Sequence, residues 1–208
     1  VLFDNADDKT RANYILLLAK IARISSEFQR AFDALSSIKD TPSVKSDVSI
    51  ELDSLANNLL VSGNKDWIDK NYSSSEKKFS LLYSISPESN IEFLYFAASS
   101  AVNAKDYDTA LNHYLTLEEL KYTGIITKYF VTEVESGNEI EVQKSEYDLF
   151  KKLKQYKDFR EEQTDSRFPE IVKNIALIYV QKNDNEKAFD AIKQARQENP
   201  TDVDLILT

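Results

Sequence analysis

The segment that decides the fold is Val172-Lys173-Asn174-Ile175-Ala176-Leu177-Ile178-Tyr179, followed by Ala188-x3-Ile192-x2-Ala195-x4-Pro200. Its apolar residues recur at spacings of three and four, which is the pattern of one face of an α-helix. The small residues at 176, 188 and 195 would let two antiparallel helices approach closely, with large residues filling the space on either side. The segment therefore predicts a pair of packed helices that ends at Pro200.

Three upstream segments repeat this spacing, although each alone would also fit an ordinary amphipathic helical hairpin. Their first helices read Leu94-x2-Ala97-Ala98-x2-Ala101, Leu52-x2-Leu55-Ala56-x2-Leu59 and Tyr14-x2-Leu17-x3-Ile21. Their second helices read Ala110-x3-Tyr114-x2-Leu117, Ser75-x3-Phe79-x2-Leu82 and Ala31-x3-Leu35-x2-Ile38. We expect one domain of four helix pairs, over about 7–39, 44–87, 90–122 and 169–200, with 202–208 opening a fifth pair.

Residues 123–168 interrupt the repeats. Ile125–Val134 is rich in β-branched and aromatic residues, Ser136-Gly137-Asn138 is a turn sequence, and Glu139–Val142 alternates again. This pattern predicts a β-hairpin. The apolar faces coincide only if paired residue numbers add to an even number, which favours a three-residue loop. The apolar residues between 147 and 159 then predict a short amphipathic helix.

Four glutamates form a candidate surface of this insertion: Glu133, Glu135, Glu139 and Glu141. The even register would place all four on one face, where facing like charges destabilise a hairpin locally. A solvated face that protects an edge strand from aggregation explains them without a function. The alternative is a surface for a cationic partner or a divalent ion. The lysines at 151, 152, 154 and 157 either neutralise this surface, as a structural clasp, or help it to steer a partner.

The whole chain resembles the tetratricopeptide repeat (TPR) superfamily. Its helix pairs are similar to the family pattern of W-x2-L-G-x2-Y, then A-x3-F and a closing proline. The segments Leu120–Gly124 and Ile171–Tyr179 resemble cell-envelope repeat proteins of Bacteroidetes. The resemblance implies an all-α fold, a right-handed α-α superhelix or solenoid, here with a β-hairpin-containing insertion. It also implies export to the periplasm and a scaffold role in envelope assembly or secretion.

Members of this superfamily bind partners in a groove formed by the first helix of each pair. Carried over by repeat position, the groove residues are Glu92, Tyr95, Ser99, Val102 and Asn103 of the third pair, and Glu170, Lys173, Leu177, Val180 and Gln181 of the fourth. The cluster of lysine, arginine and asparagine that clamps a C-terminal carboxylate in chaperone-binding members is missing from these positions. Chaperone tails are therefore not the expected partner.

Composition excludes several classes of function. The net charge of -9 would on average repel phosphate backbones and anionic lipid surfaces. No apolar run approaches the roughly 20 residues that cross a bilayer. The absence of cysteine excludes disulfides, thiolate zinc sites and cysteine nucleophiles. We expect no nucleic-acid binding, no membrane insertion, no metal and no cofactor.

Few residues could carry catalysis. His113 is the only histidine, and we expect it in a structural or solvated role. The three glycines are scattered, which excludes a glycine-rich phosphate loop. The Ser-x2-Lys matches at 36, 74 and 75 lack the companion motifs of penicillin-binding enzymes. Asp4, Asp7 and Asp8 lack the glycine and glutamate of a calcium loop, so we interpret them as the start of a helix.

The sequence therefore indicates a protein-protein interaction scaffold of the periplasm or cell envelope that is not an enzyme. The alternative is a regulatory or substrate-presenting repeat module attached to an enzyme domain outside this fragment. We expect a fragment because the chain lacks methionine and stops within an apolar pattern, so a signal peptide could precede it. A cytoplasmic location stays open, as do the identity of the protein or peptide partner and the oligomeric state.

Overall fold

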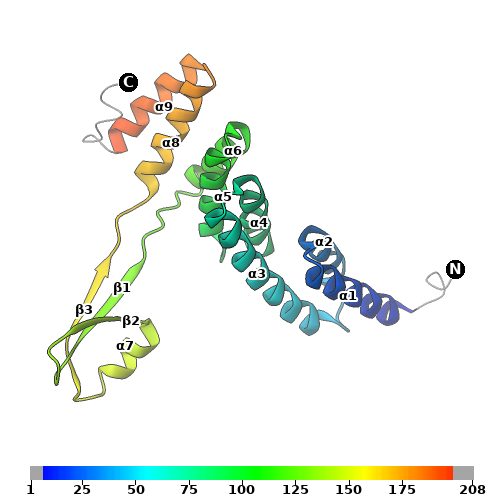
Figure 1. The fold of residues 1–208 in the computed structure, drawn as a ribbon, viewed down its shortest axis with the longest axis horizontal. Coiled ribbons are helices and arrows are strands. Elements are labelled where there is room, and N and C mark those ends of the chain that lie inside the picture. The colour runs from blue at the N-terminus through cyan, green and yellow to red at the C-terminus, as the bar shows by residue number, and fades with distance from the viewer. Residues whose placement is uncertain (1–6, 199–208) are drawn as a thin grey trace. The chain divides into compact units, whose positions relative to one another are not determined.

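The computed structural model describes residues 7–198. In this part of the chain there are nine helices and one three-stranded antiparallel sheet, so the protein is mostly helical, as expected (Figure 1). The chain divides into two compact units, which we describe separately. The first is Val1–Leu117 with Gln181–Asn183, and the second is Glu118–Val180 with Asp184–Thr208. The closing Pro200 and the expected start of a fifth pair at 202–208 lie outside the described residues.

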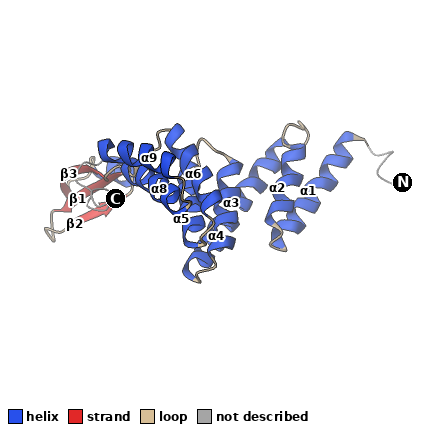
Figure 2. Cartoon of the chain, turned by 90° about the horizontal axis from the view of Figure 1, so that it is seen from above, coloured by secondary structure: helices blue, strands red, loops and turns tan. Residues whose placement is uncertain are grey.

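Helices come in consecutive pairs, and along the chain the three strands come between the third and the fourth pair. Figure 2 distinguishes the helices from the strands by colour. The first three pairs are α1 (Asp8–Ile24) with α2 (Phe28–Ile38), α3 (Lys45–Ile68) with α4 (Tyr72–Ile85), and α5 (Ile91–Asn103) with α6 (Tyr107–Glu119). The fourth pair is α8 (Phe168–Gln181) with α9 (Asn185–Glu198). The insert consists of β1 (Thr127–Glu133), β2 (Glu139–Val142), α7 (Lys144–Phe150) and β3 (Tyr156–Gln163).

The turn inside each pair has the same backbone form in all four pairs. The first helix is followed by a residue in the left-handed conformation, with φ between 57° and 62°, and these residues are Ser26, Lys70, Lys105 and Asn183. The N–H of the next residue donates to the carbonyl five positions earlier, at N···O distances of 2.7 to 3.1 Å. Four residues after this N–H donor, each second helix has a small buried residue. These residues are Ala31, Ser75, Ala110 and Ala188. The sequence repeat is therefore matched by a repeated local structure.

The two aspartates at the N-terminal end of α1 start the helix, as interpreted above. The Thr10 N–H donates to Asp7 Oδ1 at 2.7 Å, and this hydrogen bond lowers the pKa of the Asp7 carboxyl. Asp8 lies in the first turn, where the negative charge of a carboxylate interacts favourably with the helix dipole. Asp4 lies outside the described residues. Between residues 7 and 198, no group of three or more histidines or acidic residues is placed to hold a metal ion.

The face of α1 that packs into the core differs from the one that its sequence pattern indicated. Tyr14, Leu17 and Ile21 are 47%, 54% and 52% exposed. Ala12, Leu16, Ala19 and Ala22 are buried instead, in one cluster with residues of α2, α3 and α4. Both faces of α1 are apolar, and the alanine face allows the closer approach to its neighbours. The large side chains are left on the outside.

The insert contains the expected β-hairpin and a third strand that the sequence pattern does not indicate. The strand order is β2-β1-β3, and both pairings are antiparallel. The helix expected over 147–159 is limited to α7, and Tyr156 and Phe159 lie in β3 instead. The rings of Phe150 and Tyr156 stack with their centroids 4.0 Å apart. The apolar spacing between 147 and 159 therefore reflects contacts between α7 and the sheet rather than one continuous helix.

The hairpin register is also different from the even one expected. Val131 pairs with Ile140 and Tyr129 with Val142, so paired numbers add to 271. The buried face of the sheet carries Val131 and Tyr129, and Tyr129 lies against Tyr147 of α7 with ring centroids 4.9 Å apart. The alternation in the sequence instead places the apolar face on Phe130 and its even-numbered neighbours. Covering by α7 is the physical reason why the odd-numbered face is the buried one.

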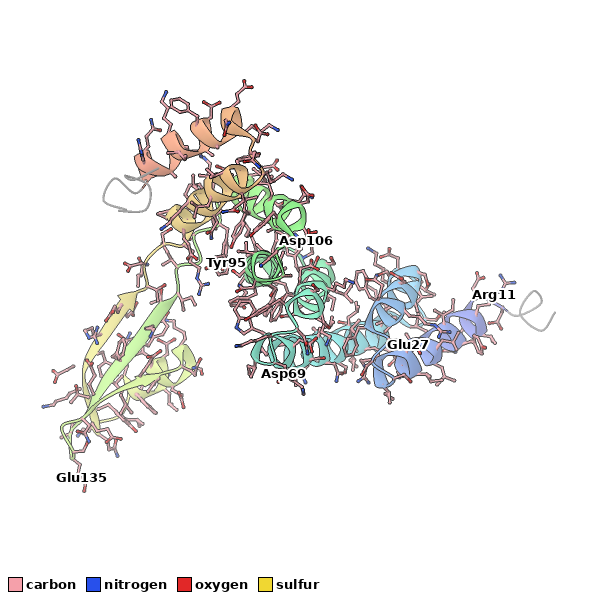
Figure 3. The ribbon with its side chains drawn as sticks, turned by 45° about the horizontal axis from the view of Figure 1, so that its top comes forward. Arg11, Glu27, Asp69, Tyr95, Asp106 and Glu135 are labelled. Atoms are coloured by element: carbon pink, nitrogen blue, oxygen red, sulfur yellow. The ribbon has the colours of Figure 1, made fainter. Side chains whose placement is uncertain are left out.

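The insert is closed at its base by hydrogen bonds between its two ends. Ile126 N–H donates to Thr164 Oγ1 at 2.9 Å, and Thr164 N–H donates to the Ile126 carbonyl at 3.0 Å. Arg167 N–H donates to the Thr123 carbonyl at 2.7 Å. The far end of the insert is the β1-β2 turn, where Glu135 lies (Figure 3). Among the described residues, no helix is both long and apolar enough to span a membrane.

Candidate protein-binding surface on the first helices

Exposed large apolar side chains are distributed unequally between the helices of the first unit. Eight of them lie on α1 and α3, which are first helices of their pairs, and none lies on the second helices α2, α4 and α6. They are Tyr14, Leu17, Ile21 and Ile24 on α1, and Ile50, Val61, Trp67 and Ile68 on α3. Scattered exposed apolar residues are normal on a protein surface, but in this unit they gather on α1 and α3, whereas α5, the first helix of the third pair, has none.

On α1 these side chains form a single stripe. Their spacing of three, four and three residues places them within about 80° of arc on the helix. The stripe lies opposite Ala12, Leu16, Ala19 and Ala22, which are buried against the neighbouring helices. Ile24 at the C-terminal end of the stripe is 75% exposed. α1 is therefore an apolar helix on both sides, although only one side is covered.

On α3 the exposed stripe mixes apolar and amide side chains. Ile50, Val61 and Ile68 are 61%, 63% and 75% exposed, and Asn57 and Asn64 lie on the same helical face. An asparagine side chain offers one acceptor and two donor positions, which together can match a peptide group. The α3 stripe thus combines apolar contact area with groups that can hydrogen-bond to a partner.

An aromatic pocket of about 310 Å³ lies beside the C-terminal half of α3. Its residues are Asn64 and Trp67 of α3, Phe79 of α4, and Tyr95, Phe96 and Ser99 of α5. The Phe79 and Phe96 rings pack with their centroids 5.7 Å apart, which fixes the inner wall. Aromatic walls with a few polar groups are typical of sites that accept an apolar side chain or a small ligand. Trp67 is the only tryptophan of the chain, so its emission reports on this pocket.

The groove residues predicted on α5 lie in different environments. Tyr95 and Ser99 line the aromatic pocket, and the Ser99 Oγ lies 3.5 Å from the hydroxyl of Tyr114. Glu92 and Asn103 are exposed, and Val102 is half-buried. The Asn103 amide donates to the Ser99 carbonyl of its own helix at 2.8 Å. Two of the five predicted residues thus contribute to the pocket.

The groove residues predicted on α8 form a separate set. Glu170 and Gln181 are exposed, Lys173 and Leu177 are half-buried, and Val180 is 37% exposed. Residues 170–180 belong to the second compact unit, whereas α5 belongs to the first. The contribution of α8 to a partner-binding surface therefore stays a prediction.

The four glutamates of the insert do not share one face, which corrects the sequence prediction. Glu139 and Glu141 pair with Thr132 and Phe130 across the hairpin, so no two glutamates are opposite each other. Arg160 of β3 donates from Nε and Nη2 to the two carboxylate oxygens of Glu139, at 3.1 and 2.9 Å. These hydrogen bonds lower the pKa of Glu139. The Arg160 guanidinium also lies over the Phe130 ring, 4.1 Å from its centroid. Arg160 therefore contacts both Glu139 and Phe130 on this face of the sheet.

Glu133 and Glu135 lie at the far end of the insert. They line a pocket of about 540 Å³ together with Val134, Lys154 and Tyr156. The Glu133 carboxylate accepts a hydrogen bond from Ser136 Oγ at 2.8 Å. Of the four lysines considered for a clasp, Lys154 lines this pocket, and Lys151 lies over the Tyr147 ring at 4.2 Å. The charge of Glu139 is compensated by Arg160 instead.

His113 has a structural contact. Its Nε2 lies 3.0 Å from Glu76 Oε1, so α6 and α4 are joined through two largely buried side chains. The two side chains are 16% and 14% exposed. The packing role agrees with the expectation from sequence.

Removing the whole insert should leave the helices folded. In the variant, Ile126–Thr164 is replaced by a short Gly-Ser linker between Ile125 and Asp165. A short linker can join these ends, because the residues next to them, Ile126 and Thr164, hydrogen-bond to each other in the intact chain. We expect an unchanged helical circular dichroism signal and nearly the same melting temperature. The shorter deletion Ile126–Gln143 is a useful contrast, because it removes the central strand β1 and should cause aggregation through the unpaired β3. Unfolding of the helices by the full excision would make the insert a structural clasp.

Sequence reasoning missed the apolar stripes and the wall formed by Trp67 and Asn64. The sequence pattern assigns Tyr14, Leu17 and Ile21 to the packed face of a repeat, and Trp67 falls outside the repeated positions. The sequence does indicate the α1 stripe, because α1 has two apolar faces. One is rich in alanine, and the large apolar residues lie on the opposite side of the helix. A scan against protein-family models found no match to this chain, and a search of curated proteins found no significant match.

Proposed function

We propose that this chain is a protein-binding scaffold that holds its partner on the outer faces of its first helices. The observation that carries the proposal is the restriction of exposed large apolar side chains in the first unit to α1 and α3. Contiguous apolar surface on a folded protein is typical of an interaction site. The aromatic pocket beside α3 adds a place for an anchoring side chain, since buried aromatic and apolar anchors dominate binding energy at interfaces.

The repeated turn supports the architecture that we propose, a right-handed solenoid of TPR type. All four pairs have a left-handed residue, the same capping hydrogen bond and a small buried residue at the same offsets. In a solenoid each unit contacts mainly its neighbours, and the first helices line one side of the stack. The resemblance of Leu120–Gly124 and Ile171–Tyr179 to envelope repeat proteins supports a location in the periplasm or cell envelope of a bacterium.

Site-specific photo-crosslinking tests this proposal. A benzophenone side chain is placed at Ile50 or Val61 on α3, and at the exposed positions Lys77 on α4 or Asn112 on α6 as matched controls. Each variant is irradiated in an extract of cells that make this protein, and the products are identified by mass spectrometry. We expect one shared partner from the α3 positions and no such product from α4 or α6. Equal crosslinking from second-helix positions would refute the assignment of the binding face.

A further inference from the structure

The aromatic pocket beside α3 is fixed by ring contacts behind its walls. The rings of Trp67 and Tyr72 pack edge-to-face with their centroids 5.2 Å apart, and the Phe79 ring stacks on Phe93 with a centroid distance of 6.3 Å. Tyr72 and Phe93 do not line the pocket themselves, so they support its walls from outside. A site whose walls are fixed before binding loses little free energy to ordering when a ligand enters.

The size and shape of the pocket fit one substituted aromatic ring. Its volume of about 310 Å³ is roughly twice that of a protein cavity that holds benzene, which is about 150 Å³. The Phe79 and Phe96 rings are inclined by 48°, and the Tyr95 and Phe96 rings by 69°. Walls at such angles let an entering ring meet one wall face-on and another edge-on, which are favourable aromatic contacts. An aliphatic side chain would be buried there without gaining these contacts.

The electrostatics of the pocket favour an uncharged ligand. None of the described residues that line it is charged. Two aspartates lie close to Trp67 in the sequence, and both are already paired, Asp66 with Lys78 and Asp69 with Lys65. A cationic ligand would therefore meet ring faces without a carboxylate, and an anionic ligand would meet no cation. Since an unpaired charge loses its hydration on burial, a neutral ring is the better fit.

Asn64 supplies a polar contact at the edge of the pocket. Its side chain is exposed, lines the pocket and makes no hydrogen bond with the described part of the chain. A carboxamide offers two donor positions and one acceptor, which match the carbonyl and the N–H of a peptide group. Trp67 lies three residues further along α3, so the two side chains are neighbours on the helix surface. Asn64 is therefore placed to bind the main chain that carries a ring into the pocket.

We propose that this pocket binds an uncharged aromatic side chain of a partner protein, and that Asn64 hydrogen-bonds to the main chain of the same partner residue. The inference rests on the proposed function and names the group by which the partner is anchored. The ring lies between Trp67 and Phe79. The peptide group stays at the exposed edge of the pocket, where Asn64 lies.

Four small probes test the proposal by titration of the full chain, with Trp67 emission as the signal. Three are the N-acetyl amides of phenylalanine, leucine and lysine, and the fourth is benzyl alcohol, which has a ring but no peptide group. We expect the phenylalanine amide to bind with a Kd of about 1 mM, which is typical for a ligand of this size. The leucine amide and benzyl alcohol should bind at least about fivefold more weakly, because one lacks the ring contacts and the other the peptide groups. The lysine amide should cause no saturable change.

An asparagine on the same face of α3 provides the matched control. N64A should weaken binding of the phenylalanine amide by about fivefold, because a hydrogen bond is lost. N57A should leave it unchanged, since Asn57 is also exposed but does not line the pocket. Both variants exchange an exposed asparagine for alanine within one helix, so their effects on helix stability are alike. Circular dichroism checks that both are folded.

The inference is overturned if the leucine or the lysine amide binds as tightly as the phenylalanine amide, or if the latter does not saturate by about 20 mM. Equal effects of N64A and N57A would remove the role of Asn64. Benzyl alcohol that binds as tightly as the phenylalanine amide would assign the pocket to a free aromatic molecule instead of a partner's side chain. If every probe fails while crosslinks from Ile50 and Val61 still identify one partner, the scaffold function stands and only the aromatic anchor is wrong.

Discussion

Replacing Arg23 with methionine should lower the free energy of unfolding by about 3 kcal/mol, because it leaves the buried Glu51 carboxylate without its cation. Glu51 is 5% exposed and is the only charged residue among the buried residues of the described chain. Arg23 donates from Nε to Glu51 Oε1, and from Nη1 to Asn58 Oδ1 at 2.9 Å. The interaction joins α1 to α3, the first helices of two consecutive pairs. Its loss should therefore loosen the surface that carries both stripes.

The same substitution at a surface arginine is the matched control. Arg30 contacts Glu27 at 2.8 Å, and the two side chains are 69% and 50% exposed. Exposed ion pairs contribute about 0 to 1 kcal/mol, so R30M should change the urea midpoint little. Combining R23M with E51L should recover most of the stability lost in R23M, since a buried pair can be replaced by apolar residues of similar volume at small cost. An R23M variant as stable as wild type would mean that Glu51 is hydrated or paired elsewhere.

The helical part of the fold was accessible from sequence because two independent signals agreed. Spacings of three and four indicated helices, and small residues at 31, 75, 110 and 188 marked the close contacts after each turn. The structure places all four of these residues in the interior. What spacing could not decide was which of two apolar faces of α1 is buried. That choice depends on how closely neighbouring helices approach, which is a property of the packed structure.

The insert was harder to predict because its strands depend on contacts that are distant in sequence. The β-hairpin was correctly identified from turn residues and β-branched residues. The predicted register was wrong because the face with the buried Val131 is the one where Tyr129 packs against Tyr147 of α7, a residue that no local pattern connects with the hairpin. β3 was missed because its sequence is mostly charged, and a charged edge strand has no alternating apolar face. Its pairing with β1 and the Arg160–Glu139 ion pair hold it in place.

The candidate site was predicted in part. Tyr95 and Ser99 were selected by repeat position and do line a pocket, together with residues of α3 and α4. Trp67 and Asn64 were not selected, because the pocket exists only where side chains of α3, α4 and α5 meet. This meeting of three helices is a property of the packed structure, which spacing along the chain does not indicate.

Gly63 should be the most sensitive position for this pocket. It lies inside α3, where glycine is less favourable than alanine by about 1 kcal/mol, so its presence needs a packing reason. A Cβ at this position would lie 3.1 Å from Cε1 and 3.3 Å from Cδ1 of Phe79. The Gly63 carbonyl also accepts a hydrogen bond from the buried Ser75 Oγ at 3.0 Å. The absent side chain thus allows α3 and α4 to cross closely.

We expect G63L to lower the free energy of unfolding by about 3 kcal/mol, at the upper end of the range for overpacking. The Phe79 ring cannot yield easily, because it is 2% exposed and packs against Phe96 and Phe93 at centroid distances of 5.7 and 6.3 Å. G63A should stay within about 1 kcal/mol of wild type, since the gain in helix propensity offsets a small ring displacement. Urea unfolding followed by circular dichroism measures both variants.

The second readout is Trp67, because it shares the pocket with Phe79. In G63L the displaced Phe79 ring should enter the pocket and shift Trp67 emission in the folded state, whereas G63A should leave it nearly unchanged. Adding F79A to G63L should remove the ring that the new leucine side chain clashes with. The double variant should therefore be more stable than the sum of the two single effects predicts. Strict additivity of the two substitutions would show that Gly63 and Phe79 do not share a contact, and the close crossing of α3 and α4 would then need another explanation. Coupling together with a shifted emission would establish that the same glycine sets both the stability of the second pair and the shape of the proposed binding pocket.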